Sequence, residues 1–223
     1  MSSFDSYQYQ WMDPFGPLST LHKINPVRLS FIEKVMKNKT KTVLDVGCGG
    51  GIFTFHLHNA LPELSITGID SSAQAIQAAA SYAASNDLKV CFHHQTATQP
   101  TQKKYDLIIC FELIEHVSKP KSLIKALSQQ LTKNGLLIIS TLDKTTFSFL
   151  QNILIAEHLL EIVPKGTHAY NQFISPDTLI EMARDFHLNP VLINGIHIDP
   201  LSYQFSLSDS IQPNYFVAFE HAT

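Results

Sequence analysis

Short aliphatic runs alternate with longer amphipathic stretches along most of this chain. The aliphatic runs are typical of strands buried on both faces, and the amphipathic stretches are typical of helices that pack on a sheet. This alternation predicts an α/β fold, with a mostly parallel sheet, right-handed crossovers and helices on both faces. The expected strands cover residues 42–46, 65–70, 89–94, 105–111, 136–141, 190–198 and 214–221, and the expected helices cover residues 25–36, 52–60, 72–86, 119–132 and 176–187.

Turn and cap residues set the expected boundaries. Asn25 before Pro26 predicts the start of the first helix, and Asn134-Gly135 predicts the end of the helix over 119–132. The last two strands are joined by a turn-rich connection without a helical pattern, so the final strand is expected to insert antiparallel. The chain therefore predicts a seven-stranded sheet in a single domain of residues 1–223. Further helix caps are expected at Ser71 or Ser72 and at Ser175.

Two segments fall outside this alternation. Residues 1–25 contain Trp11 and other aromatic side chains, which are rare in free tails, and they predict a lid. Residues 144–166 place apolar side chains on a helical stripe wider than one core face needs. The stripe has two interpretations: a helix that covers a pocket mouth or forms a dimer face, and an interfacial helix that touches a bilayer and admits a lipid-like substrate.

Composition and charge narrow the function. A formal charge of -3 and a pI near 6.4 provide no basic field for a polynucleotide, so no nucleic-acid partner is expected. Cys48, Cys91 and Cys110 lack the spacing of a disulfide framework or a metal site, and are expected to be reduced core thiols of a cytoplasmic protein. The sequence shows no leader pattern and no run long enough to span a bilayer, so we expect any membrane contact to be peripheral.

The chain is organised around a glycine-rich turn after the first expected strand. Residues 43–51 read Val-Leu-Asp-Val-Gly-Cys-Gly-Gly-Gly, and glycines such as Gly47 and Gly49 allow positive φ and close approach of a ligand. The Gly-x-Gly-x-Gly spacing differs from the dinucleotide fingerprint, and Asp45 just before it disfavours phosphate and favours a cation. Asp70 ends the next apolar run, where a carboxylate can accept hydrogen bonds from both ribose hydroxyls. These residues predict a nucleoside-like cofactor.

An acidic loop follows the strand over 105–111. Glu112, Glu115 and His116 can ligate a divalent ion that holds a phenolic oxygen as its anion, or His116 can take the phenol's proton directly. A further interpretation is that His116 only orders the loop through backbone hydrogen bonds. Glu112 is expected near the cofactor, and Phe111 is expected to pack on the adenine face.

The glycine turn, Gly-Ile-Asp at residues 68–70 and the acidic loop together resemble the class I methyltransferases that use S-adenosylmethionine. The chain resembles more specifically the UbiG family, the bacterial O-methyltransferases of ubiquinone biosynthesis, from about residue 11 to residue 215. This resemblance rests further on Trp11 with Asp13, Leu-His-Lys-Ile-Asn-Pro-Val-Arg at residues 21–28, Ser-Thr-Leu at residues 140–142 and Val-Pro-Lys-Gly-Thr-His at residues 163–168.

The resemblance implies methyl transfer to a 2-polyprenyl-6-hydroxyphenol and to the later 3-demethylubiquinol catechol. It also implies a membrane-contacting insertion at residues 144–166, a location at the inner membrane face and a partner complex of ubiquinone biosynthesis. In eukaryotic relatives a divalent ion such as Mg²⁺ is associated with a Glu-x-x-Glu-His loop, which maps onto Glu112, Glu115 and His116. The cofactor contacts implied by the matching motifs are Arg28, Gly47, Asp70 and Phe111.

Other functions remain open from the residues alone. The same machinery suits methylation of another small apolar phenol or acid. A protein that binds the cofactor without turnover, as a subunit of a lipid-biosynthetic complex, would carry the same cofactor motifs. A nicotinamide oxidoreductase fits less well, because the glycine spacing departs from its fingerprint.

Overall fold

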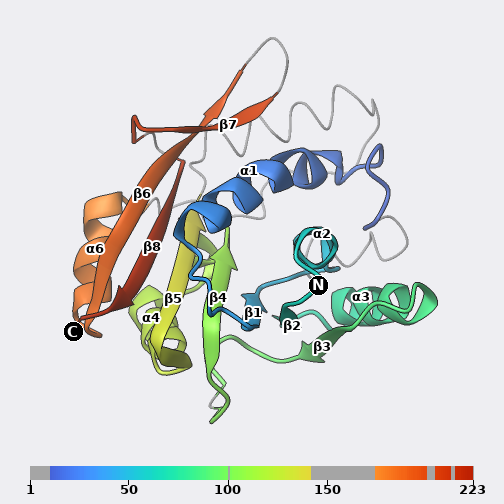
Figure 1. Ribbon diagram of the computed structural model, residues 1–223, viewed down its shortest axis with the longest axis horizontal. Coiled ribbons are helices and arrows are strands. Elements are labelled where there is room, and N and C mark those ends of the chain that lie inside the picture. Colours follow the sequence, from blue (N-terminus) through green and yellow to red (C-terminus); the bar gives the residue numbers. More distant parts are fainter. Residues whose placement is uncertain (1–10, 100, 142–173, 200–203, 212–213, 223) are drawn as a thin grey trace.

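The computed structural model describes residues 11–99, 101–141, 174–199, 204–211 and 214–222. The described strands form one eight-stranded sheet at the centre of the molecule (Figure 1). In their order across the sheet, the strands are β3 (Val90–His94), β2 (Ser65–Asp70), β1 (Thr42–Val46), β4 (Tyr105–Phe111), β5 (Leu131–Thr141), β8 (Tyr215–His221), β6 (Leu188–Ile198) and β7 (Phe205–Ser208).

The pairing confirms a mostly parallel sheet whose last strand is antiparallel. The first five strands pair in parallel, and β8 inserts antiparallel between β5 and β6. The sheet has eight strands rather than seven, because β7 pairs antiparallel with β6 at the far edge. The four residues of β7 lie within the turn-rich connection, and such a short segment gives little periodicity to detect.

Helices cover both faces of the sheet, as the alternation predicts. One hydrophobic cluster packs α1 and α2 on the sheet, and another packs α4 and α6 on the opposite face. The described helices are α1 (Ser19–Val35), α2 (Ile52–Ala60), α3 (Ala73–Ser85), α4 (Pro120–Ser128) and α6 (Pro176–Arg184). None of these described helices is both long and apolar enough to cross a membrane.

Two expected helix boundaries are wrong. α1 begins at Ser19, six residues before the expected cap, and Pro26 lies inside the helix. Asn25 therefore does not cap it; the Asn25 amide contacts the carbonyl oxygen of Ile52 at 3.4 Å instead. α4 ends at Ser128, and Asn134-Gly135 lie within β5 rather than at a helix end.

The glycine in β5 has a different physical reason from a helix cap. A Cβ at Gly135 would lie 2.9 Å from the backbone oxygen of Tyr105, so only glycine allows this approach of β4 and β5. The register between the two strands shifts at the same place, between Tyr105 and Leu107. Glycine here marks a strand irregularity, which a turn-like dipeptide does not distinguish from a cap.

Other local expectations are confirmed. The Ser72 side chain accepts from the backbone N–H of Ala75, and the Ser175 side chain accepts from that of Thr178, so both serines cap helices. The three cysteines are free thiols, but the expected core position is wrong for Cys91, which is exposed on the edge strand β3. The apolar stripe at residues 144–166 and the first ten residues of the expected lid lie outside the described residues.

Candidate functional site

A pocket of about 230 Å³ lies at the carboxyl ends of β1 and β2, beside the acidic loop after β4. This edge is where open α/β sheets hold their ligands. Its walls combine a few polar groups with aliphatic side chains, the composition expected of a nucleoside site. The lining residues are Gly47, Ile69, Asp70, Ser71, Gln95, Thr96, Ala97, Thr98, Leu113, Val117 and Leu123.

The glycine turn forms one wall of this pocket. Gly47 and Gly49 have φ of +76° and +54°, which side-chain-bearing residues rarely adopt. The backbone N–H of Gly47 donates to the carbonyl oxygen of Ile69 at 2.8 Å, and this bond ties the turn to the end of β2. The turn therefore holds its open shape through the neighbouring strand, and Gly47 reaches the pocket as expected.

Asp70 fixes the second wall. Its Oδ2 accepts from the backbone N–H of Gly49 at 2.9 Å, and its Oδ1 accepts from that of Ser72 at 2.8 Å. One carboxylate thus connects the glycine turn to the start of α3. Each carboxylate oxygen accepts more than one hydrogen bond, so lone pairs remain for ribose hydroxyls on the pocket side.

Asp45 is buried beside the turn, with 4% of its surface exposed. Burial raises the pKa of this carboxyl to about 6, although a 2.6 Å hydrogen bond from the Thr54 hydroxyl and the nearby Arg28 charge act in the opposite direction. Asp45 does not line the pocket described above. It places an ionisable group under the turn that is mostly charged at neutral pH.

Arg28 of α1 is buried and held on several sides. Its guanidinium donates to the Asn25 side chain at 3.0 Å and forms an ion pair with Glu112. It also lies over the rings of Phe53 and Phe111, 5.7 and 5.3 Å from their centroids. Its buried Nε has no hydrogen-bond partner among the described residues, so one donor is left for a ligand.

Phe111 does not lie where the sequence placed it. Its ring packs edge-on against Phe53 and Phe216, and it is 9% exposed. It belongs to the core beneath α1 and α2 rather than to the lining of the pocket. Within the described pocket, the apolar walls suited to a base come from Ile69, Ala97, Leu113 and Val117 instead.

Glu112 is fully engaged by protein groups. One carboxylate oxygen pairs with Arg28, and the other accepts from the Ser140 hydroxyl at 2.7 Å. Its backbone has φ of +46°, in the left-handed region, which costs about 1–3 kcal/mol and needs surrounding contacts to hold it. These contacts direct Glu112 toward α1.

Glu115 acts on the core at the face of the sheet that α4 and α6 cover. Burial, and next the charge of Glu115, raises the pKa of Cys110 and of Tyr215, two residues of the core under α4 and α6. His116 is exposed at the end of the short helix Ile114–His116. Among the described residues, no three His, Cys, Asp or Glu side chains are grouped to hold a metal ion. The expected metal set is not assembled among the described residues, because the Glu112 carboxylate bonds to Arg28 and Ser140 instead.

Trp11 covers the glycine turn from outside. A Cβ at Gly50 would lie 2.1 Å from the indole carbon Cδ2, so the ring lies directly on the backbone. His22 contacts the Trp11 carbonyl oxygen through Nε2 at 2.9 Å. The described part of the expected lid segment therefore packs on the turn, with Leu18, Ile52 and Ala75 around it.

Sequence reasoning missed much of the pocket wall. Residues 95–98 follow β3, and the carboxyl end of a parallel strand was a signal that could have found them. The contacts of Arg28 with Glu112 and of Gly50 with Trp11 gave no such signal, because the two residues of each contact are distant in sequence.

The strand order and the glycine turn define a class I methyltransferase fold, the fold of S-adenosylmethionine-dependent methyltransferases. A family model described as a methyltransferase domain matches residues 21–193. Among solved structures, the PH0226 protein from Pyrococcus horikoshii has a TM-score of 0.74 at 15% identity, over 96% of this chain and 97% of that chain. Magnesium protoporphyrin IX methyltransferase from Synechocystis with bound SAH has a TM-score of 0.65 at 18% identity, over 92% and 84%.

Curated relatives are more specific. The ubiquinone biosynthesis O-methyltransferase of Coxiella burnetii is 37% identical over 225 residues, which cover 99% of this chain and 94% of that protein. The protein of the same name from Rickettsia akari is 34% identical over 224 residues, covering 97% and 88%. The chain belongs to the methyltransferase-domain family and, within it, to the family of ubiquinone biosynthesis O-methyltransferases.

Proposed function

We propose that this protein transfers the methyl group of S-adenosylmethionine to phenolic oxygens of polyprenylated ubiquinone precursors, a 2-polyprenyl-6-hydroxyphenol and 3-demethylubiquinol. The observation that carries the proposal is nearly full-length identity of 34–37% to ubiquinone biosynthesis O-methyltransferases. The pocket at the sheet edge, with Gly47 and Asp70 in its wall, supplies the matching cofactor site.

Each wall of the pocket has a role in holding the cofactor. Asp70 binds the ribose hydroxyls, and the aliphatic wall around Leu113 packs on the adenine. The buried Arg28 guanidinium does not line the pocket, but its positive charge favours the cofactor's carboxylate, and Gly47 lets the cofactor approach the backbone closely. Asp45 adds negative charge under the turn, which favours a cationic cofactor. When bound, S-adenosylmethionine supplies the methyl group that moves from the sulfonium sulfur to the phenolic oxygen.

Deprotonation of the acceptor falls to the loop after β4. A phenol of pKa near 10 is mostly neutral at pH 7, so transfer needs a group to take its proton. His116 is exposed at this edge and can accept the proton on its imidazole. Among the described residues the loop side chains do not gather as a metal-ligand set, so the proposal assigns the proton to His116.

The polyprenyl tail explains the apolar stripe at residues 144–166. Such a stripe suits an interfacial helix that contacts the membrane peripherally, at its inner face, and gives the tail an apolar path to the pocket. Replacing stripe leucines by serine is expected to impair long-chain acceptors far more than short water-soluble ones. Equal loss on both would remove the lipid role.

The test of the function is transfer of a labelled methyl group from S-adenosylmethionine to a short-prenyl catechol. The wild-type protein is expected to produce the O-methyl ether with or without a chelator. His116→Asn is expected to lower kcat by about 10²–10⁴-fold, the usual contribution of a general base. The matched control is His93→Asn, a change at an exposed histidine of the edge strand β3, which is expected to leave kcat unchanged.

The remaining outcomes separate the alternatives. Chelator-sensitive transfer would assign the proton to a metal and return Glu112, Glu115 and His116 to the role of ligands. Binding of the cofactor without transfer to any phenol would support a non-catalytic subunit of a lipid-biosynthetic complex. Transfer to another small phenol or acid, but not to the prenylated catechol, would keep the chemistry and change the substrate.

A further inference from the structure

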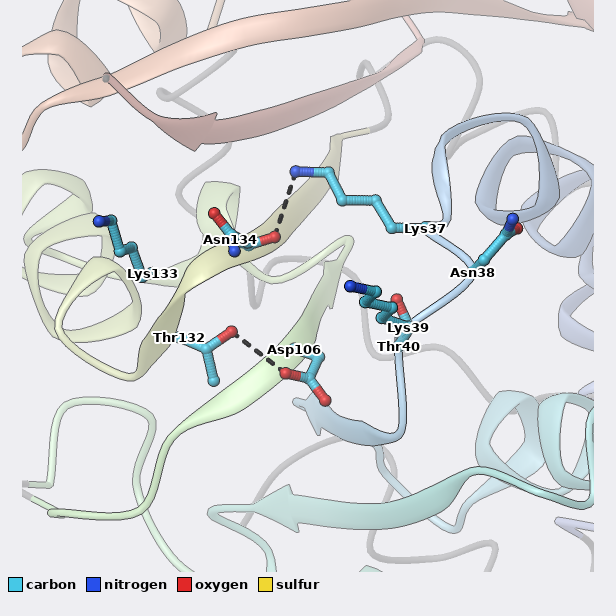
Figure 2. A pocket seen from close by; sticks show the side chains of 8 residues that line it. All are labelled: Lys37, Asn38, Lys39, Thr40, Asp106, Thr132, Lys133 and Asn134. Carbon is cyan, nitrogen blue, oxygen red and sulfur yellow. Dashed lines mark hydrogen bonds between the residues drawn. The ribbon is translucent and has the colours of Figure 1, made fainter.

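A second cleft lies at the opposite edge of the sheet, where the parallel strands begin. It has a volume of about 450 Å³ and lies between the segment after α1 and the first residues of β4 and β5 (Figure 2). No residue of this cleft lines the cofactor pocket. Its lining consists of Lys37, Asn38, Lys39, Thr40, Asp106, Thr132, Lys133 and Asn134.

Asp106 is the acidic residue in this lining, and protein donors occupy its carboxylate. Oδ2 accepts from the backbone N–H groups of Lys41 and Thr42, both at 3.1 Å, and from the Thr42 hydroxyl at 3.0 Å. Oδ1 accepts from the Thr132 hydroxyl at 3.2 Å. Burial alone would raise the pKa of Asp106, but these hydrogen bonds outweigh it and lower the pKa. Its carboxylate therefore holds the strand ends together and offsets one of the positive charges around the cleft, and the lysines still outnumber it.

The lysines give the cleft a positive charge. Lys37 donates to the backbone oxygen of Asn134 at 3.2 Å and pairs with Glu220 at 2.8 Å, beside the cleft. Lys39 and Lys133 are exposed, and the described residues provide no carboxylate within ion-pair distance of either. Lys41 adds a further exposed cation next to them. This local excess stands out in a chain whose formal charge is -3.

We propose that this cleft is a docking site for an acidic segment of a partner protein, whose carboxylates bind Lys39 and Lys133. Several ammonium groups spaced along an open cleft suit several carboxylates spaced along one peptide. Surface charges of this kind steer association and select the partner, more than they supply affinity. Docking here leaves the cofactor pocket at the other edge accessible.

Two other occupants fit less well. A small anion such as phosphate binds best to clustered backbone N–H groups, but those of Lys41 and Thr42 already donate to Asp106. A membrane bound at this edge would lie far from the cofactor pocket at the other edge, although the polyprenyl acceptor is held in the bilayer. This argument against a membrane rests on the proposed function. The geometry therefore favours an acidic peptide over both.

The test uses the full chain and a fluorescein-labelled decapeptide of alternating glutamate and serine, followed by anisotropy at low salt. Lys39→Glu/Lys133→Glu is expected to weaken peptide binding by about tenfold or more. The two introduced glutamates would repel the carboxylates of the peptide that the lysines attract. The control Lys119→Glu/Lys125→Glu changes the total charge equally at exposed positions near α4. It is expected to weaken binding less than about threefold, through the change in the overall field. Thermal unfolding, measured on the same samples, reports whether each variant is folded.

The outcomes decide the proposal independently of the methyl-transfer reaction. No peptide binding, or equal weakening by both variant pairs, would overturn it. So would tighter competition by inorganic phosphate than by the unlabelled peptide. Vesicles of phosphatidylglycerol are expected not to bind. If the wild-type protein does bind them, and only Lys39→Glu/Lys133→Glu loses this vesicle binding, the cleft would be assigned to a membrane instead.

Discussion

At the scale of single residues, Asp45 ties folding stability to pH. The folded protein raises the pKa of this carboxyl from 3.8 to about 6, mainly by burial. The folded state therefore holds the proton more tightly than the unfolded state, so stability is lost as pH rises from 3.8 to about 6. Taken alone, this loss amounts to about 3 kcal/mol.

Asp45→Asn is expected to remove this component, because the amide does not titrate. Urea unfolding at several pH values between 4 and 7 measures it as the free energy of unfolding of the variant minus that of the wild type. This difference should increase by about 3 kcal/mol as pH rises, because the wild type loses stability over this range and the variant does not. Asp87→Asn, at an exposed position, serves as the control. A difference that stays constant with pH would contradict the raised pKa.

The ion pair of Arg28 and Glu112 should behave as a buried pair. Its side chains are 6% and 16% exposed, and removing one partner of such a pair typically costs about 3–5 kcal/mol because the other charge stays buried. Arg28→Met/Glu112→Gln should therefore cost less than the sum of the single changes in urea unfolding. The exposed pair of Lys121 and Asp185 offers the contrast, with an expected coupling much smaller than that of the buried pair because solvent screens both charges. Equal coupling in both cycles would contradict the buried geometry.

At the scale of elements, Trp11 explains a glycine that the turn itself does not require. Gly50 lacks the positive φ of its neighbours, but the indole occupies the space of a Cβ. Gly50→Ala is expected to destabilise the fold by about 1–3 kcal/mol through overpacking, and Trp11→Leu in the same chain should restore part of this loss. Gly47→Ala is the matched control, because its φ of +76° is strained and Leu113, not Trp11, lies opposite its Cβ position. Rescue of Gly47→Ala by Trp11→Leu to the same extent in thermal unfolding would contradict this distinction.

The elements also mark how far sequence patterns reach. Aliphatic runs located the central strands, because a strand buried on both faces leaves a continuous apolar signal. Asn25 and Gly135 were misassigned, because each is explained by a contact with a distant segment, Ile52 and Tyr105 respectively. In the site, Gly47 and Asp70 were predictable from their local motif, but Glu112 bonds to Arg28 84 residues away. Short-range patterns do not specify such partners.

At the scale of the whole molecule, the two edges of the sheet separate two kinds of surface. The carboxyl edge holds the proposed cofactor pocket with Asp70 and the acidic loop. The amino edge holds the lysine-lined cleft (Figure 2). The strands between them are packed on both faces by the helices. Ligand binding at one edge therefore stabilises the whole sheet, and a rise in the unfolding temperature detects the binding.

Thermal unfolding with S-adenosylhomocysteine tests this separation. A ligand that binds only the folded state at about 100 times its Kd adds about 2.7 kcal/mol, which raises the Tm of a chain of this size by about 5–10 °C. Asp70→Asn is expected to lose most of this rise relative to its own ligand-free Tm, because one of the two carboxylate acceptors becomes an NH₂ donor and the negative charge is lost. Lys39→Glu/Lys133→Glu should keep the full rise. A full rise in Asp70→Asn would place the cofactor outside the pocket, and a reduced rise in the lysine variant would show that the two edges are coupled.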